Sequence, residues 1–191
     1  MSNRIITISR QYGSGGHEIA EELSRQLGIP YYDQDIIAEV AVKTGYDKEF
    51  VSEQGENVEN SGWWHSLTSR SRFESNPQDI IWNVTEKVIR EMAAKESCII
   101  IGRGGDYILD GQNTLKVFVM AKMEDRLNRV RTEYGNANAT VELLQKMDKK
   151  RSSFYKYYTD MTWGAAPNYD LCLNTSMIGI KRSIEMIKEF Y

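Results

Sequence analysis

Small residues are concentrated in one short segment near the start of the chain, Ser9-Arg-Gln-Tyr-Gly-Ser-Gly-Gly-His17. A loop of this kind, placed before a helix, directs several backbone N–H groups at one point, and the helix N-terminus adds a field that favours an anion. The sequence therefore predicts that phosphate groups bind at Gly13, Ser14, Gly15 and Gly16. A structural turn is the alternative that the glycines alone leave open.

The segment departs from the standard phosphate-loop pattern, which ends in a glycine, a lysine and a serine or threonine. Alignment on Gly15 places Arg10 at the first glycine, Gly16 at the lysine and His17 at the hydroxyl-bearing position. Arg10 or His17 would then have to supply the missing positive charge, although the helix N-terminus opposes protonation of a histidine there. A dinucleotide-binding fingerprint is disfavoured because Glu18 replaces its last glycine.

Two further segments carry arginine in contexts that suit phosphate chemistry. Arg103 lies in the glycine loop Gly102-Arg-Gly-Gly105, where it has few structural duties and a phosphate is a natural partner. Asp148 and Arg151 are three residues apart on one face of an expected helix. That spacing fits an internal ion pair as well as an arginine that stabilises charge during phosphoryl transfer.

Composition narrows the classes of protein. The 191 residues include 27 acidic and 24 basic side chains, a formal charge of -3, which argues against nucleic acid or an anionic membrane as a partner. No apolar run reaches the roughly 18 residues of a membrane span, so the cytoplasm is the expected compartment. Cys98 and Cys172 lie in apolar runs and are expected to be buried, reduced thiols, and only two histidines are present, which argues against a zinc site.

Apolar periodicity places these segments on an alternating set of strands and helices. Residues 4–9 predict a buried strand, and Ile19, Leu23 and Leu27 predict a helix that ends near Gly28. The same reasoning predicts helices from about 33, from a cap at Asn76 to about 94, at 123–134, at 140–157 and at 178–190, and strands at 98–101, 115–121 and 169–173. Strands separated by helices predict a mostly parallel sheet with helices on both faces, and both glycine loops should lie at its carboxyl edge.

One long segment, residues 44–78, is polar and lacks a strong period. Such a segment is typical of a cover or a binding element. It contains Gly62-Trp-Trp-His65, in which Trp63 and Trp64 could stack on an acceptor base or pack the segment against the domain.

Taken in order, the motifs resemble those of the cytidylate kinase-like family, within the P-loop nucleoside monophosphate kinases. The resemblance rests on Ile8–Ala20, Ile29-Pro-Tyr-Tyr-Asp33, Ile100–Gly105, Asp148–Arg151, Tyr157-Tyr-Thr159 and Asn168–Ser176. It implies a single three-layer α/β/α domain over residues 1–191, with a core of 1–43, 79–122 and 168–191. An acceptor-binding insertion would cover about 44–78 and a helical lid about 123–160.

The family's chemistry implies roles for particular residues. Asp33 follows the second strand, where the family places an aspartate near the acceptor nucleotide, unless it only caps the next helix. Arg103 would hold the acceptor's phosphate, but Gly104 replaces the family's neighbouring aspartate, for which Asp106 could compensate. Asp148 would help to bind the acceptor and Arg151 would close over the phosphates.

The resemblance implies ATP as donor, Mg²⁺ as cofactor and a nucleoside monophosphate, CMP, dCMP or UMP, as acceptor. The Mg²⁺ ligands cannot be assigned, because Ile101 stands where the family has a carboxylate. A nucleotide-binding sensor and a kinase for a non-nucleotide small molecule are the alternatives. The retained arginines favour transfer, whereas the missing lysine and metal positions favour sensing.

Overall fold

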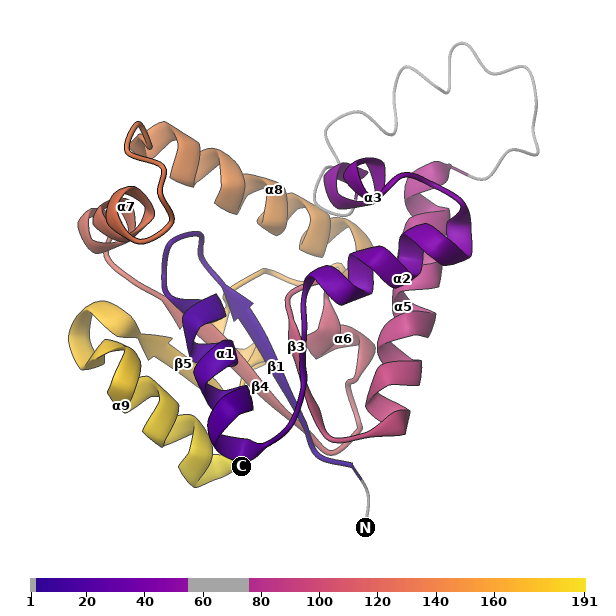
Figure 1. The fold of residues 1–191 in the computed structure, drawn as a ribbon, viewed down its shortest axis with the longest axis horizontal. Helices are drawn as coiled ribbons and strands as arrows, with labels where there is room; N and C mark the ends of the chain where they lie inside the picture. Colours follow the sequence, from indigo (N-terminus) through magenta and orange to yellow (C-terminus); the bar gives the residue numbers. More distant parts are fainter. Residues whose placement is uncertain (1–2, 55–75) are drawn as a thin grey trace.

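The computed structural model describes residues 3–54 and 76–191, and within them the chain folds around one parallel sheet (Figure 1). The strand order is β2-β3-β1-β4-β5, so β1 lies at the centre. All neighbouring strands run parallel, in register from Ile5 beside Cys98 on one side and Thr114 on the other. The strands are β1 (Ile5–Arg10), β2 (Tyr31–Tyr32), β3 (Cys98–Ile101), β4 (Thr114–Met120) and β5 (Leu171–Asn174).

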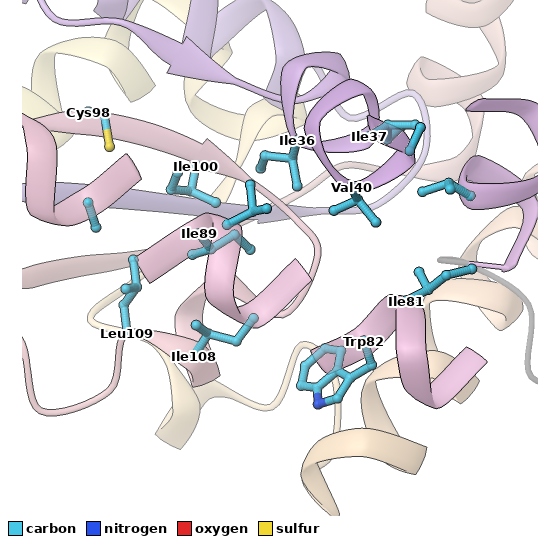
Figure 2. Close-up of a cluster of buried hydrophobic side chains, with 14 of the residues drawn as sticks. Ile36, Ile37, Val40, Ile81, Trp82, Ile89, Cys98, Ile100, Ile108 and Leu109 are labelled. Atoms are coloured by element: carbon cyan, nitrogen blue, oxygen red, sulfur yellow. The ribbon is translucent and has the colours of Figure 1, made fainter. Parts of the chain in front are cut away.

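Helices cover both faces of the sheet, which gives the expected three layers. Along β1 and β3 the isoleucines alternate between the two faces, so each strand contributes to both apolar clusters. Ile6 and Ile8 pack with the helices α1 (Gly16–Leu27) and α9 (Thr175–Phe190). Figure 2 shows the opposite cluster, where side chains of α2 (Gln34–Thr44), α5 (Pro77–Lys95) and α6 (Gly105–Ile108) meet β3.

Two helices lie over the edge of the sheet at which β1 ends. These are α7 (Met123–Thr132) and α8 (Val141–Thr159), and α8 returns through a short 3₁₀ helix, Ala166–Asn168, to β5. Thr140 caps α8 by accepting a hydrogen bond from the Leu143 N–H. The arrangement brings α8 against the loop that follows β1, although more than a hundred residues separate the two in sequence.

Most elements lie within a few residues of their predicted positions. The Asn76 side chain caps α5 as expected, by accepting from the Gln78 N–H, and Gly28 ends α1 in the left-handed conformation. The segment predicted to be irregular contains a helix, α3 (Lys48–Gln54). Within α9, Gly179 has a non-helical φ of 75° and forms a kink that the sequence did not predict.

Two expectations about particular side chains need comment. Cys98 is buried as predicted, but Cys172 is exposed, because β5 is an edge strand and the helices do not cover that position. Trp63 and Trp64 lie outside the described residues. Among the helices that are described, none is long and apolar enough to cross a bilayer.

Candidate active site

The loop between β1 and α1 is built by glycines that adopt conformations other residues avoid. Gly13 and Gly15 have φ angles of 77° and 87°, and Gly16 begins α1. The buried Ser14 side chain faces the protein, where its Oγ donates a hydrogen bond to the Gln11 carbonyl at 2.8 Å. The Ser14 N–H also donates to the Gln11 carbonyl, at 3.2 Å, and the Ser14 carbonyl accepts from Thr175 Oγ1 at 2.8 Å, so Ser14 anchors the loop through both its side chain and its backbone. Phosphate binding by this loop stays a prediction, and its geometry suits that role.

Arg10 explains why the lysine position holds glycine. A Cβ on Gly16 would lie 2.6 Å from the Cβ of Arg10 and 2.8 Å from its Cγ, so the stem of Arg10 fills that space. A Cβ on Gly102 would likewise collide with the guanidinium of Arg10. The Arg10 side chain therefore extends from the start of α1 toward the second glycine loop, where its guanidinium lies beside Gly102.

Asp33 lies opposite Arg10 and His17. Its carboxylate is 3.8 Å from Arg10 Nη2 and 3.4 Å from His17 Nδ1, and its side chain is only 12% exposed. Asp33 occupies the N-cap position of α2 but makes no side-chain capping bond, so helix capping does not account for it. His17 is 49% exposed and meets the edge of the Tyr31 ring. The side chains of Asp33 and His17 therefore lie on the same side of the glycine loop.

Arg103 and Arg151 approach the site from the other side. Arg103 has a φ of 56°, unusual for a residue with a side chain, between Gly102 and Gly104, which are also left-handed. A Cβ on Gly104 would lie 2.9 Å from the Trp82 ring, which explains why glycine replaces the family's aspartate. From α8, Arg151 Nη1 donates to the Arg10 carbonyl at 3.0 Å, and its guanidinium lies over the Tyr12 ring.

The three arginines share one cleft. Arg10, Arg103 and Arg151 line an opening of about 380 Å³, within the range of ligand pockets, together with Tyr12, Gly13, Gly16, His17, Asp33, Gln34, Ser52, Tyr134 and Met147. The same three arginines line a smaller cavity of about 30 Å³, whose other walls include Ser9, Phe154, Tyr155 and Trp163. Three guanidinium groups around one space favour an anionic ligand.

The side chain of Asp148 contacts the loop that follows β1 and the helix α7. One of its oxygens accepts from the Tyr12 N–H at 2.8 Å, and the other accepts from Arg126 Nη2 at 2.5 Å. Arg126 is only 3% exposed, and its Nε donates to the Tyr12 carbonyl at 2.7 Å. Both backbone groups of Tyr12 are thus held by this ion pair. Acceptor binding by Asp148 remains a prediction, and its observed contacts position the loop.

Arg129 adds a further tie between α7 and the loop. Its Nη1 donates to the Gly13 carbonyl at 2.9 Å. Sequence reasoning missed that Arg126 and Arg129 hold loop carbonyls. One sequence signal points to this role. Arg126 falls on the apolar face of the expected helix, and charged residues are rarely buried there without a partner.

Asp106 does not take the place of the aspartate that Gly104 lacks. Its carboxylate is 2% exposed and faces inward, where it accepts hydrogen bonds from Tyr155 Oη at 2.6 Å and Ser9 Oγ at 3.2 Å. Burial raises the pKa of Asp106, and the two hydrogen bonds oppose that rise. Burial beside this carboxylate also raises the pKa of Tyr155, so its hydroxyl stays protonated and donates.

Metal ligands are scarce in the described residues. In residues 3–54 and 76–191, no group of three or more His, Cys, Asp or Glu side chains is close enough to form a metal site. Asp33 is the carboxylate that lines the cleft. One carboxylate beside the glycine loop would fit Mg²⁺, which keeps several waters and takes its other ligands from substrate phosphates.

Comparison with known proteins places this geometry in a family. Residues 5–177 match the model of the cytidylate kinase-like family. No curated protein matches the sequence. An uncharacterized protein from Eubacterium ventriosum is similar in structure, with a TM-score of 0.72, 25% sequence identity and 98% of each chain covered.

Two kinases share the fold at low identity. A shikimate kinase from Bacteroides thetaiotaomicron aligns with a TM-score of 0.57 and 14% identity over 98% of this chain and 97% of its own. A gluconokinase from Sinorhizobium meliloti aligns with a TM-score of 0.53 and 12% identity over 97% and 96%. These two similarities show the fold alone.

Proposed function

The chain belongs to the cytidylate kinase-like family, and on that premise we propose that it transfers the γ-phosphate of ATP to a nucleoside monophosphate, CMP, dCMP or UMP. The observation that carries the proposal is the convergence of Arg10, Arg103 and Arg151 on one cleft beside the glycine loop. Phosphoryl transfer depends on positioning and on stabilising charge, and arginines supply both.

In the proposed reaction an oxygen of the acceptor's phosphate attacks the γ-phosphorus of ATP in line. The bond between that phosphorus and the β–γ bridging oxygen breaks, so the products are ADP and a nucleoside diphosphate. The N–H groups of Gly13, Gly15 and Gly16 would hold the donor phosphates with Arg10. Arg103 would hold the acceptor's phosphate, and Arg151 would stabilise the charge that develops between them.

Mg²⁺ would neutralise the donor phosphates when bound. Asp33 would hold it, directly or through water, because this carboxylate lies on the loop side of the cleft between Arg10 and His17. Its ion pair with Arg10 and its contact with His17 also keep Asp33 oriented when no metal is present. Asp33 therefore serves the metal and the loop rather than the end of α2.

The missing lysine is the observation that favours the second candidate, a nucleotide-binding sensor with little activity. The stem of Arg10 excludes a side chain at position 16, so the site lacks the cation usual in phosphate loops. Arg10 supplies a charge there, and the catalytic arginines around the cleft would have no purpose in a sensor that binds only the donor. We therefore favour transfer.

The test is an acceptor panel with Mg-ATP and purified protein. Transfer to at least one of CMP, dCMP and UMP is expected, and Arg151→Ala should lower kcat by about 10²-fold or more, as loss of a transition-state donor does. Arg182→Ala is the matched control, because Arg182 is exposed on α9 and pairs with Glu185. Shikimate and gluconate belong on the panel, since transfer only to such an acceptor would replace the nucleotide assignment. ATP binding with no transfer to any acceptor would leave the sensor.

A further inference from the structure

One buried carboxylate has no part in the proposed reaction, although it lies directly behind the arginine cleft. Asp106, in α6, is 2% exposed and accepts hydrogen bonds from two side chains of other elements. Ser9 donates from the end of β1, and Tyr155 donates from α8. A carboxylate costs free energy to bury unless such partners satisfy it. A carboxylate retained at this cost suggests a purpose beyond packing.

Each member of this network is adjacent to one of the three arginines. Ser9 immediately precedes Arg10 in β1. Tyr155 follows Arg151 by one turn of α8, so the two side chains extend from the same face of that helix. Asp106 itself follows Arg103 by three residues in the second glycine loop. The network therefore joins the three elements that present guanidinium groups to the cleft.

The backbone next to Asp106 packs closely against the sheet. A Cβ on Gly105 would lie 2.8 Å from Ile100 Cγ2, so the backbone of α6 is pressed against the sheet. Ser9 and Tyr155 also line the small cavity that Arg10, Arg103 and Arg151 surround. A shift of either hydroxyl would move a wall of the space into which the guanidinium groups extend.

We propose that Asp106 is a positioning residue that sets Arg10 through Ser9, and Arg151 through Tyr155, relative to Arg103. It does so without touching the substrate. Its importance for catalysis rests on the proposed function, whereas the placement of the arginines is a property of the protein alone. The hydrogen bond from Tyr155 ties the helix that carries Arg151 to the sheet, and the bond from Ser9 fixes the strand end that carries Arg10.

The test measures the reactivity of individual arginines with phenylglyoxal, read by peptide mass spectrometry in the absence of nucleotide. Tyr155→Phe should raise the labelling rate of Arg151 by about tenfold, the effect of losing one hydrogen bond to a charged group, and should change Arg10 less. Ser9→Ala should show the reverse preference. Asp106→Asn should raise the labelling rate of at least one of the two arginines, because its amide keeps only one of the two oxygens that accept from Ser9 and Tyr155.

Asp110→Asn is the matched control, since Asp110 is an exposed acid of the same segment that pairs with Lys116. Its arginine labelling should equal that of the natural protein. Folded Tyr155→Phe, Ser9→Ala and Asp106→Asn proteins with unchanged labelling of Arg10 and Arg151 would overturn the proposal. So would a uniform rise at all arginines, including Arg90 on the surface of α5, because that result reports unfolding.

The transfer assay then separates this proposal from the proposed function. Tyr155→Phe should lower kcat more than it raises the KM for ATP, because Arg151 acts on charge that develops during transfer. A protein with no transfer activity but with the expected labelling pattern would contradict the proposed function and leave the positioning intact. An unchanged kcat beside the expected labelling would show that the arginine placement does not serve catalysis.

Discussion

Arg10 and Gly16 depart together from the standard phosphate-loop pattern. Arginine stands at the place of the first glycine, and glycine stands at the place of the lysine. Because the Arg10 stem lies 2.6 Å from where a Cβ on residue 16 would stand, arginine at 10 and a side chain at 16 exclude each other. The pair Trp82 and Gly104 follows the same rule in the second loop. At Gly16 and Gly104, the departure from the family's motif therefore accompanies a neighbour that fills the space of the missing side chain.

This relation predicts that restoring the motif one residue at a time will fail. Gly16→Lys should destabilise the protein by about 1–3 kcal/mol, because the new side chain overpacks against Arg10. Arg10→Gly combined with Gly16→Lys should recover most of that free energy of unfolding and retain ADP binding, a non-additive result that marks direct contact. Urea unfolding of the two single variants and the double variant measures it. A Gly16→Lys protein as stable as the natural one would contradict the account of Arg10.

The sequence predicted the cation but not its geometry. Aligning the loop on Gly15 identified Arg10 and His17 as candidates, since the missing lysine left few others nearby. It did not show that the Arg10 stem crosses the position of Gly16, because the direction of a side chain at a strand end depends on tertiary neighbours. The choice between helix cap and ligand for Asp33 also required the structure, since both functions suit an aspartate at that place.

At the scale of elements, α7 and α8 are joined to the phosphate loop by an ion pair that holds Tyr12. Asp148 and Arg126 bind the N–H and the carbonyl of Tyr12, and Arg129 binds the Gly13 carbonyl. A helix pair held in this way can open as a lid only if these bonds break. The alternation of strands and helices made both helices predictable, but the identity of the buried arginine was not.

The structure predicts that Arg126 is costly to remove. Arg126→Ala should lower the free energy of unfolding by about 3 kcal/mol, because it leaves a carboxylate and a backbone carbonyl without their partner in a nearly buried site. Arg182→Ala, an exposed arginine that also pairs with a carboxylate, should have little effect. Guanidinium unfolding curves compare the two. Equal losses of the free energy of unfolding in the two variants would show that the Arg126–Asp148 pair, which holds Tyr12, does not contribute to stability.

The missed helix α3 has a physical explanation at the same scale. Its seven residues, Lys48–Gln54, offer one buried side chain, Val51, so no apolar period marks it in the sequence. It packs against α2 and α5, and this tertiary contact stabilises a helix too short to form alone. Long periodic helices such as α5 were predictable for the opposite reason.

At the scale of the whole molecule, a chain with a formal charge of -3 gathers arginines at one edge of its sheet. A net negative protein would repel nucleotides over long distances, so the local arrangement of cations must dominate their binding. The fold was predictable because β-strand and helix periods alternate along the chain. The division into core, insertion and lid stays a prediction, since part of the insertion lies outside the described residues.

The most direct test of the account is the shift in thermal unfolding that ADP and ATP produce, with and without Mg²⁺, in four proteins: natural, Arg10→Ala, His17→Ala and Arg182→Ala. A ligand that binds the folded state raises its stability in proportion to the logarithm of its concentration over Kd. We expect a clear rise for the natural protein and for Arg182→Ala, and a smaller one for Arg10→Ala and for His17→Ala. Equal rises in the natural protein and Arg10→Ala would contradict the account, because the loop backbone alone would then hold the phosphates.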